Sequence, residues 1–153
     1  HRPSNVDDVK KLIKILNICK KFKNEKFIFP AHPRTKLKIK SIKNLEKNLI
    51  IVEPLSYFSF NFLLKNAKGI ITDSGGITEE ATYFKIPCVT MRSSTERPET
   101  VKLGTNILIG NNYQLLKNSI NKINAGKWKR SKIPEKWDGK TAVRILNILN
   151  KIL

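Results

Sequence analysis

The chain has 153 residues, of which 40% are hydrophobic and 27% are charged, the size and composition of one globular domain. It contains seven glycines, seven prolines and two cysteines, which excludes a collagen-like chain and a disulfide-stabilised scaffold. No apolar run approaches the roughly 18 residues of a membrane span, and no signal-peptide pattern is seen. We therefore expect a soluble, cytoplasmic domain without a membrane partner.

The positive charge is large but unevenly distributed. Thirty Lys and Arg residues against twelve Asp and Glu residues give a net charge of +18. The net charge is +10 over residues 1–48, −1 over 49–100 and +9 over 101–153. Because the excess lies in the two outer thirds and is mostly lysine, a strongly hydrated cation, we interpret it as a solvated surface rather than a nucleic-acid interface.

The first predicted element is a helix that begins near Asn5 and ends at Phe22. Asn5 is a favourable N-cap residue, and Asp7 and Asp8 would lie in the first turn, where the helix dipole favours negative charge. Apolar residues recur along it at spacings of three and four. One face of this helix can therefore pack against a sheet.

Short apolar strands then alternate with helices to the end of the chain. Strands are predicted at 26–30, 48–52, 69–72, 87–91 and 106–109. Helices are predicted at 35–45, 57–66, 77–84, 113–123 and 140–152, with a shorter helix opened by Pro98 and ended by Gly104. Apolar strands joined by helices are typical of a parallel sheet buried on both faces, so we predict a doubly wound α/β fold.

Sheets of this kind bind ligands beyond the carboxyl ends of their strands. After the strand at 69–72, the chain turns through Ser74, Gly75 and Gly76 into a helix. Glycines permit positive φ and let a ligand approach the backbone, and N–H groups at a helix start favour an anion such as phosphate. We predict a phosphate-binding loop here; the alternative is an ordinary turn between a strand and a helix.

Two carboxylates follow this loop in the predicted helix. Either Glu79 or Glu80 could accept hydrogen bonds from ribose hydroxyls, as the acidic residue of dinucleotide-binding folds does. Since successive helical residues are about 100° apart, only one of them can face the ligand. The alternative is that both only complement the positive end of the helix dipole.

Other catalytic and cofactor motifs are incomplete. Ser74 does not fit the Gly-x-Ser-x-Gly pattern of hydrolases, because Thr72 stands at the first glycine position. The Walker sequence and the Gly-x-Gly-x-x-Gly dinucleotide motif are both missing, so nothing indicates NAD. The two histidines and two cysteines lack the spacing of a zinc site, and Cys19 and Cys88 are interpreted as core thiols.

A segment with two arginines and two glutamates follows the strand at 87–91. Arg92 leaves the carboxyl end of that strand and could pair with a phosphate through two hydrogen bonds. For Glu96 and Arg97 the alternatives are a functional role and a local ion pair that holds the segment. We therefore predict Arg92 as the second anion ligand.

A histidine and an aromatic helix complete the candidate edge. His32 follows the strand at 26–30 and is either a ligand contact or a structural residue. Three phenylalanines of the helix at 57–66 are predicted core residues, one of which could instead stack on a base: Phe58, Phe60 and Phe62. The aromatic content of this helix is therefore compatible with a nucleotide ligand.

Taken in order, these segments resemble the carboxyl-terminal half of the non-hydrolysing UDP-N-acetylglucosamine 2-epimerases. The matching residues and segments are His1-Arg2, 29–33, 53–55, 72–76, 79–81, Arg92, 95–99, Gly104 and Gly110. The family has two Rossmann-like domains that face each other across a cleft, the GT-B arrangement. This chain is similar to the second, UDP-binding domain over residues 1–153, with 124–153 as a linker and closing helix.

The resemblance also implies roles for individual residues. Ser74, Gly75 and Gly76 would hold the diphosphate, Glu80 the ribose and Arg92 the phosphates or the sugar, while Phe60 would stack on uracil, the Leu55 backbone would recognise the uracil edge, and His1 would be catalytic. His32 remains a possible site residue. The implied partners are a UDP-sugar, an N-terminal domain of the same enzyme and a second copy in a homodimer, with no metal or cofactor.

The reaction implied is inversion at carbon 2, which interconverts UDP-GlcNAc and UDP-ManNAc. UDP would be eliminated to give a 2-acetamidoglucal and then added again after a proton returns to the opposite face. A hydrolysing epimerase or a glycosyltransferase half remains an alternative. The resemblance further implies a strand that ends at His1 and lies between the strands at 26–30 and 69–73, so we expect the natural protein to extend upstream.

Overall fold

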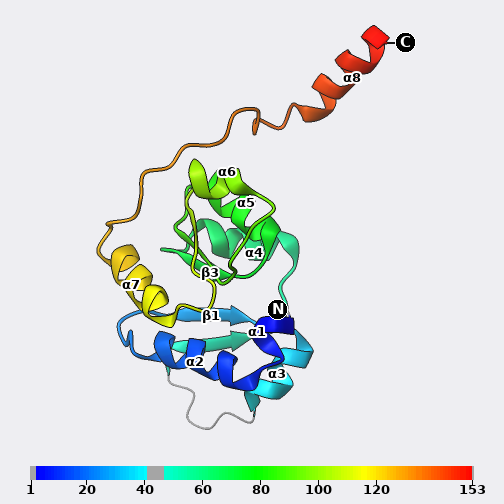
Figure 1. Cartoon of the computed structure of the whole chain (residues 1–153). Helices are drawn as coiled ribbons and strands as arrows, with labels where there is room; N and C mark the ends of the chain where they lie inside the picture. Colours follow the sequence, from blue (N-terminus) through cyan, green and yellow to red (C-terminus); the bar gives the residue numbers. More distant parts are fainter. Residues whose placement is uncertain (1–2, 41–46, 153) are drawn as a thin grey trace.

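A computed structural model describes residues 3–40 and 47–152 of the chain (Figure 1). Every predicted strand is present, with bounds that differ by one residue at most. The strands are β1 (Phe27–Pro30), β2 (Leu49–Val52), β3 (Ile70–Thr72), β4 (Cys88–Thr90) and β5 (Asn106–Leu108). His1 and positions 41–45 of one predicted helix lie outside the described residues.

The predicted helices are also present, with one division and two shifts. They are α1 (Pro3–Val6), α2 (Val9–Lys20), α3 (Pro33–Lys40), α4 (Tyr57–Lys65), α5 (Gly75–Tyr83), α6 (Pro98–Lys102), α7 (Tyr113–Asn124) and α8 (Thr141–Ile152). The single helix predicted from Asn5 to Phe22 is therefore two helices. Helices α3 and α5 each begin two residues earlier than predicted, at Pro33 and Gly75.

The predicted N-cap at Asn5 is wrong. Asp8 caps α2 instead, because its Oδ1 accepts a hydrogen bond of 2.9 Å from the Lys10 N–H. Asn5 lies inside the short α1, where its side chain is buried and bonds to residues far away in the sequence. Asp8, which was expected in the first turn, is thus the cap, and the Asn5 amide is engaged in tertiary contacts instead.

The strands are parallel, as predicted, but they form two sheets. In one sheet β1 pairs with β2, with Phe27 opposite Leu49. In the other the order is β3-β4-β5, with Ile71 opposite Val89. The α/β class is therefore confirmed, while β1 and β3 are not paired with each other.

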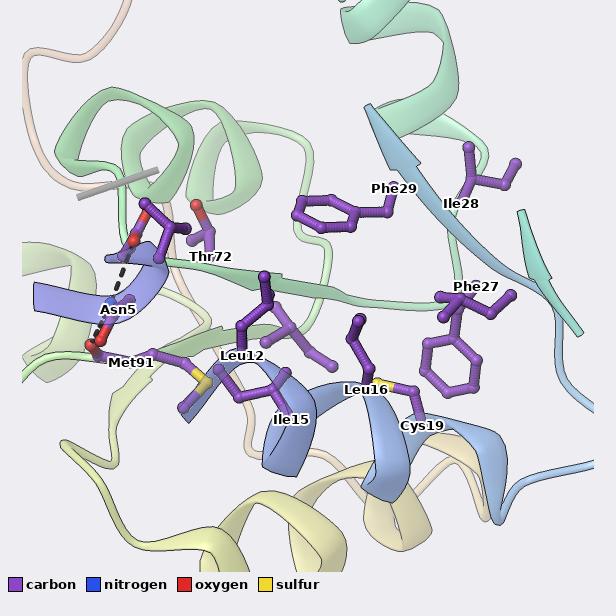
Figure 2. Close-up of a pocket in the computed structure, with 14 residues that line it drawn as sticks. Asn5, Leu12, Ile15, Leu16, Cys19, Phe27, Ile28, Phe29, Thr72 and Met91 are labelled. Atoms are coloured by element: carbon purple, nitrogen blue, oxygen red, sulfur yellow. Dashed lines mark hydrogen bonds between the residues drawn. The ribbon is translucent and has the colours of Figure 1, made fainter. Parts of the chain in front are cut away.

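An apolar hollow of about 150 Å³ lies between the two sheets (Figure 2). Phe27, Ile28 and Phe29 line it from β1, and Ile71 lines it from β3. Helix α2 contributes Leu16 and neighbouring apolar residues from below in this view. The facing edges of the two sheets are thus apolar, which is the character of interior rather than surface strands.

Three buried clusters hold the helices against the sheets. The first joins α2 and α3 to β1 and β2 through Leu12, Ile39 and Leu49. The second packs α7 on β4 and β5, and the third packs α4 and α5 on β4. Cys19 and Cys88 are buried, and burial raises the pKa of each thiol to about 12, so their assignment as core thiols is confirmed.

Helix α8 stands apart from these clusters (Figure 1). None of its described side chains is buried, and its apolar residues are largely exposed. Even so, among the helices within residues 3–40 and 47–152, none combines the length and apolar character needed to cross a bilayer.

Candidate functional site

The predicted phosphate-binding loop is the start of helix α5. Ser74 is the N-cap residue, and its own N–H donates to the Thr72 Oγ1 at 3.1 Å. The first N–H groups of a helix have no acceptor within that helix, so those of Gly75 and Gly76 are directed beyond its end. This places backbone donors at the carboxyl end of β3, as an anion site requires.

Gly75 and Gly76 let a ligand come close to the backbone, and neither has an unusual backbone conformation. Both are helical, so the positive φ that the sequence suggested is not used here. A Cβ added at Gly76 would meet no described heavy atom within 4 Å. The backbone at this position is therefore open to a ligand, which is the second reason for glycine in such a loop.

The loop opens on a hollow of about 710 Å³. This hollow is also lined by His32 after β1, by Leu55 after β2 and by Phe60 of α4. Parallel strands bring these separate segments together, because their carboxyl ends lie at one edge. Three predicted site residues that are distant in sequence thus surround the same space as Ser74 and Gly75.

Only one of the three predicted core phenylalanines lines this hollow. Phe60 is half-buried, whereas Phe58 and Phe62 are 84% and 71% exposed, so the core prediction is wrong for the latter two. The reason is the helical period: Phe58 and Phe62 are four residues apart and share the outer face of α4, while Phe60 and Leu64 share the inner face.

Arg92 lies beside the loop and is held by a carboxylate. Its Nη1 and Nη2 donate to the two carboxylate oxygens of Glu96 at 2.9 and 2.7 Å. Glu96 Oε2 lies 3.9 Å from the position of a Cβ added at Gly75. The hydrogen bonds from Arg92 to Glu96, helped by the charges of Glu96 and Asp73, raise the pKa of Arg92, so the guanidinium is a permanent cation.

The predicted pair between Glu96 and Arg97 is not formed by their side chains. Arg97 Nε instead donates to Glu79 Oε1 at 2.7 Å, while Glu96 binds Arg92. Glu96 and Arg97 therefore each form an ion pair with a different residue rather than with each other. The Arg97–Glu79 pair ties the segment after β4 to α5, while the Arg92–Glu96 pair closes within that segment.

The two carboxylates of α5 both line a second hollow of about 340 Å³, together with Tyr57 and Asn61 of α4. Glu79 is also paired with Arg97. The structure therefore does not bring Glu80 to the hollow lined by Ser74 and Gly75, and its role in binding ribose stays a prediction.

Sequence reasoning missed one residue of this edge. The Nδ2 of Asn5 donates to Asp73 Oδ2 at 3.0 Å and to the Met91 carbonyl oxygen at 3.2 Å. Asn5 is 68 and 86 residues from these partners, and a polar residue near a helix start is most simply explained as a cap. His1 itself lies outside the described residues, but α1 brings the adjoining segment to the loop.

Chemically, this edge is suited to a phosphorylated ligand. It combines backbone donors and an aromatic side chain around one hollow with a fixed guanidinium on the segment beside the loop. Within the described part of the chain, no three His, Cys, Asp or Glu side chains are grouped as metal ligands.

Comparison with known proteins gives one consistent result. A family model described as UDP-N-acetylglucosamine 2-epimerase matches residues 1–150. UDP-N-acetylglucosamine 2-epimerase from Methanocaldococcus jannaschii is 40% identical over 97% of this chain and 42% of its own length. The enzyme of that name from Methanococcus maripaludis is 44% identical over 80% of this chain and 36% of its own length.

Solved structures agree with the sequence relatives. The crystal structure of the Methanocaldococcus jannaschii enzyme in complex with UDP-GlcNAc and UDP is 39% identical, with a TM-score of 0.80 over 99% of this chain and 43% of that one. The Neisseria meningitidis enzyme bound to UDP-GlcNAc is 28% identical, with a TM-score of 0.81 over the same shares. The chain spans less than half the length of these relatives. Sequence and fold together show that the chain belongs to the UDP-N-acetylglucosamine 2-epimerase family.

Proposed function

We propose that this chain is the UDP-binding part of an enzyme that interconverts UDP-GlcNAc and UDP-ManNAc by inversion at carbon 2. The observation that carries the proposal is the start of α5, where the N–H groups of Gly75 and Gly76 begin a helix beside a hollow that Leu55 and Phe60 also line. Solved relatives of the same fold contain UDP or UDP-GlcNAc, which supports this choice of ligand.

In the proposed reaction this chain stabilises the leaving group. A base removes the proton at carbon 2, the bond between carbon 1 and the diphosphate oxygen breaks, and UDP and a 2-acetamidoglucal are formed. A proton then reaches carbon 2 from the opposite face while the diphosphate oxygen adds back to carbon 1. The loop N–H groups and Arg92 hold the negative charge of the diphosphate, which lowers the barrier to its departure.

The acid–base groups are proposed to come from His1 and from an N-terminal domain of the same enzyme. A carbon acid needs a positioned base on one face and a positioned acid on the other. His32 and Asp73 are the titratable side chains that line the described hollow, and we assign the pair that acts at carbon 2 to groups outside it. We therefore propose a two-domain enzyme that works in the cytoplasm as a homodimer, with this chain binding UDP.

We also propose that a segment preceding residue 1 contributes a strand between β1 and β3. The support for this is the apolar hollow between the sheets, lined by Ile28 on one side and Ile71 on the other. Helices α1 and α2 precede β1, so a strand before them would enter the sheet through the usual crossover between parallel strands. It would join the two sheets into one.

Calorimetry with UDP tests the proposed ligand, using protein expressed from its complete coding sequence. We expect UDP binding with little dependence on salt, and loss of that binding in Glu80→Ala but not in Glu79→Ala, the adjacent carboxylate already paired with Arg97. Steep salt dependence on DNA without affinity for UDP would instead indicate a nucleic-acid-binding protein.

Product analysis in deuterated water tests the reaction. Deuterium at carbon 2 of an intact UDP-sugar is expected, because the proton at that carbon exchanges during inversion. Free ManNAc together with UDP would show a hydrolysing enzyme, and an unlabelled sugar transferred to an acceptor would show a glycosyltransferase.

A further inference from the structure

One buried amide joins the two segments that carry the candidate diphosphate ligands. Asn5 of α1 is 8% exposed, and its Nδ2 donates to both Asp73 Oδ2 and the Met91 carbonyl oxygen (Figure 2). The donor distances are 3.0 and 3.2 Å, within the normal range for such bonds. Both hydrogens of one side-chain nitrogen are thus used inside the protein.

The acceptors are placed directly before the ligand groups. Asp73 precedes Ser74, and Met91 precedes Arg92. Strands β3 and β4 run side by side up to this point, where the Met91 N–H donates to the Thr72 carbonyl oxygen at 2.8 Å. Asn5 bridges the two segments at Asp73 and Met91, each one residue beyond the end of its strand.

We propose that Asn5 is a positioning residue for diphosphate binding, which holds the segment before Ser74 and the segment before Arg92 at a fixed separation. The inference rests on the proposed function, that is, on UDP binding at this loop. Asn5 need not touch the ligand for this role. It acts through Asp73 and through the backbone of Met91.

The second reason for assigning this role to Asn5 is the charge of its partner Asp73. Asp73 lines the same hollow as Ser74 and Gly75, so its negative charge lies close to the space proposed for the diphosphate. The bond from Asn5 engages Oδ2 and fixes the side chain. Loss of this bond removes one of the contacts that fix the carboxylate, whose negative charge repels a diphosphate at short distance.

Three variants test the proposal by calorimetry with UDP, in protein expressed from its complete coding sequence. Asn5→Ala removes both bonds, and the nearly isosteric Asn5→Asp replaces the donor with a carboxylate oxygen. We expect each to weaken UDP binding by about tenfold or more, since the hydrogen bond to a charged group is lost. Adding Asp73→Asn to Asn5→Asp restores a donor and an acceptor between these positions, and should recover at least about threefold of the affinity.

Asn48 supplies a matched control. Its Nδ2 also bridges two acceptors, the carbonyl oxygens of Cys19 and Phe22 at 3.3 and 3.0 Å, but it lies away from the loop. Asn48→Ala should lower the melting temperature as Asn5→Ala does, and yet leave the affinity for UDP within about twofold of the wild type.

The outcomes separate this proposal from the proposed function. If the wild type binds UDP and Asn5→Asp binds it equally well, the role of Asn5 is wrong while the proposed function stands. If Asn48→Ala loses as much affinity as Asn5→Ala, the effect is general destabilisation and the proposal is again overturned. If the wild type does not bind UDP, both the proposed function and this inference are wrong. If Asn5→Ala does not fold, the UDP affinities of Asn5→Asp and of Asn5→Asp combined with Asp73→Asn decide whether the proposal holds.

Discussion

Replacing Arg92 by alanine tests whether the segment after β4 supplies a ligand for the diphosphate. The Arg92 side chain is 11% exposed, and both terminal nitrogens are held by Glu96 at 2.9 and 2.7 Å. Glu96 Oε2 in turn lies 3.9 Å from a Cβ position on Gly75. The guanidinium is therefore already fixed beside the loop, and a diphosphate there competes with Glu96 for it.

The size of the effect follows from the bond gained and the bond given up. A hydrogen bond to a charged group contributes about 1.5–3 kcal/mol. Glu96 is 60% exposed, so its pair with Arg92 contributes only about 0–1 kcal/mol. Subtracting about 0.5 kcal/mol, the middle of that range, leaves a net contribution to UDP binding of about 1–2.5 kcal/mol, so Arg92→Ala should weaken binding by about 5- to 70-fold.

Calorimetry with UDP at two salt concentrations measures this change, with Arg97→Ala as the matched control. Arg97 belongs to the same segment and is 48% exposed, but its partner is Glu79. The control should stay within about twofold of the wild type, and the loss in Arg92→Ala should shrink at high salt because salt screens charge. Unchanged binding in Arg92→Ala, or an equal loss in Arg97→Ala, would refute the reasoning.

Three further predictions concern the fold. Gly104→Ala places a Cβ 2.6 Å from the Thr100 carbonyl oxygen and against Thr82, so the free energy of unfolding in urea should fall by about 1–3 kcal/mol; no loss would show that the site can relax. Cys19 and Cys88, with pKa values of about 12 against an ordinary 9.0, should resist alkylation at pH 8, and stability should fall as pH rises from about 9 because the unfolded thiols ionise first; rapid alkylation of the native protein would contradict their burial. Finally, residues 1–153 alone should melt at low temperature without cooperativity if a strand between β1 and β3 is missing, and a cooperative melt at high temperature would show that strand to be dispensable.

Local signals in the sequence were sufficient for the elements and for most of the site. Apolar runs marked the strands, and the glycine pair after β3 marked the loop. His32 could be expected near that loop because parallel strands direct their carboxyl ends to one edge, whereas the resemblance to the epimerase family implied Leu55 and Phe60. The physical reason is that helices and strands each have a fixed short repeat, so the pattern of buried apolar residues along the sequence identifies them.

The partners of polar side chains were not predictable in this way. Glu96 lies next to Arg97 in sequence but binds Arg92, and Arg97 binds Glu79. Asn5 is an equally good cap on local grounds, yet its amide is turned inward toward Asp73. Such choices depend on which groups reach one another after the strands have assembled.

By itself, the sequence determined the α/β class, the order of strands and helices, and the position of the loop, because short-range periodicity and glycine chemistry are local properties. Only the tertiary structure decided which carboxylate holds Arg92, where Glu80 faces, and that β1 and β3 are separated by an apolar hollow. The hydrogen bonds involved join residues that are 4 to 86 positions apart in the sequence. The energy of such a bond depends on burial and geometry, which no local sequence pattern encodes.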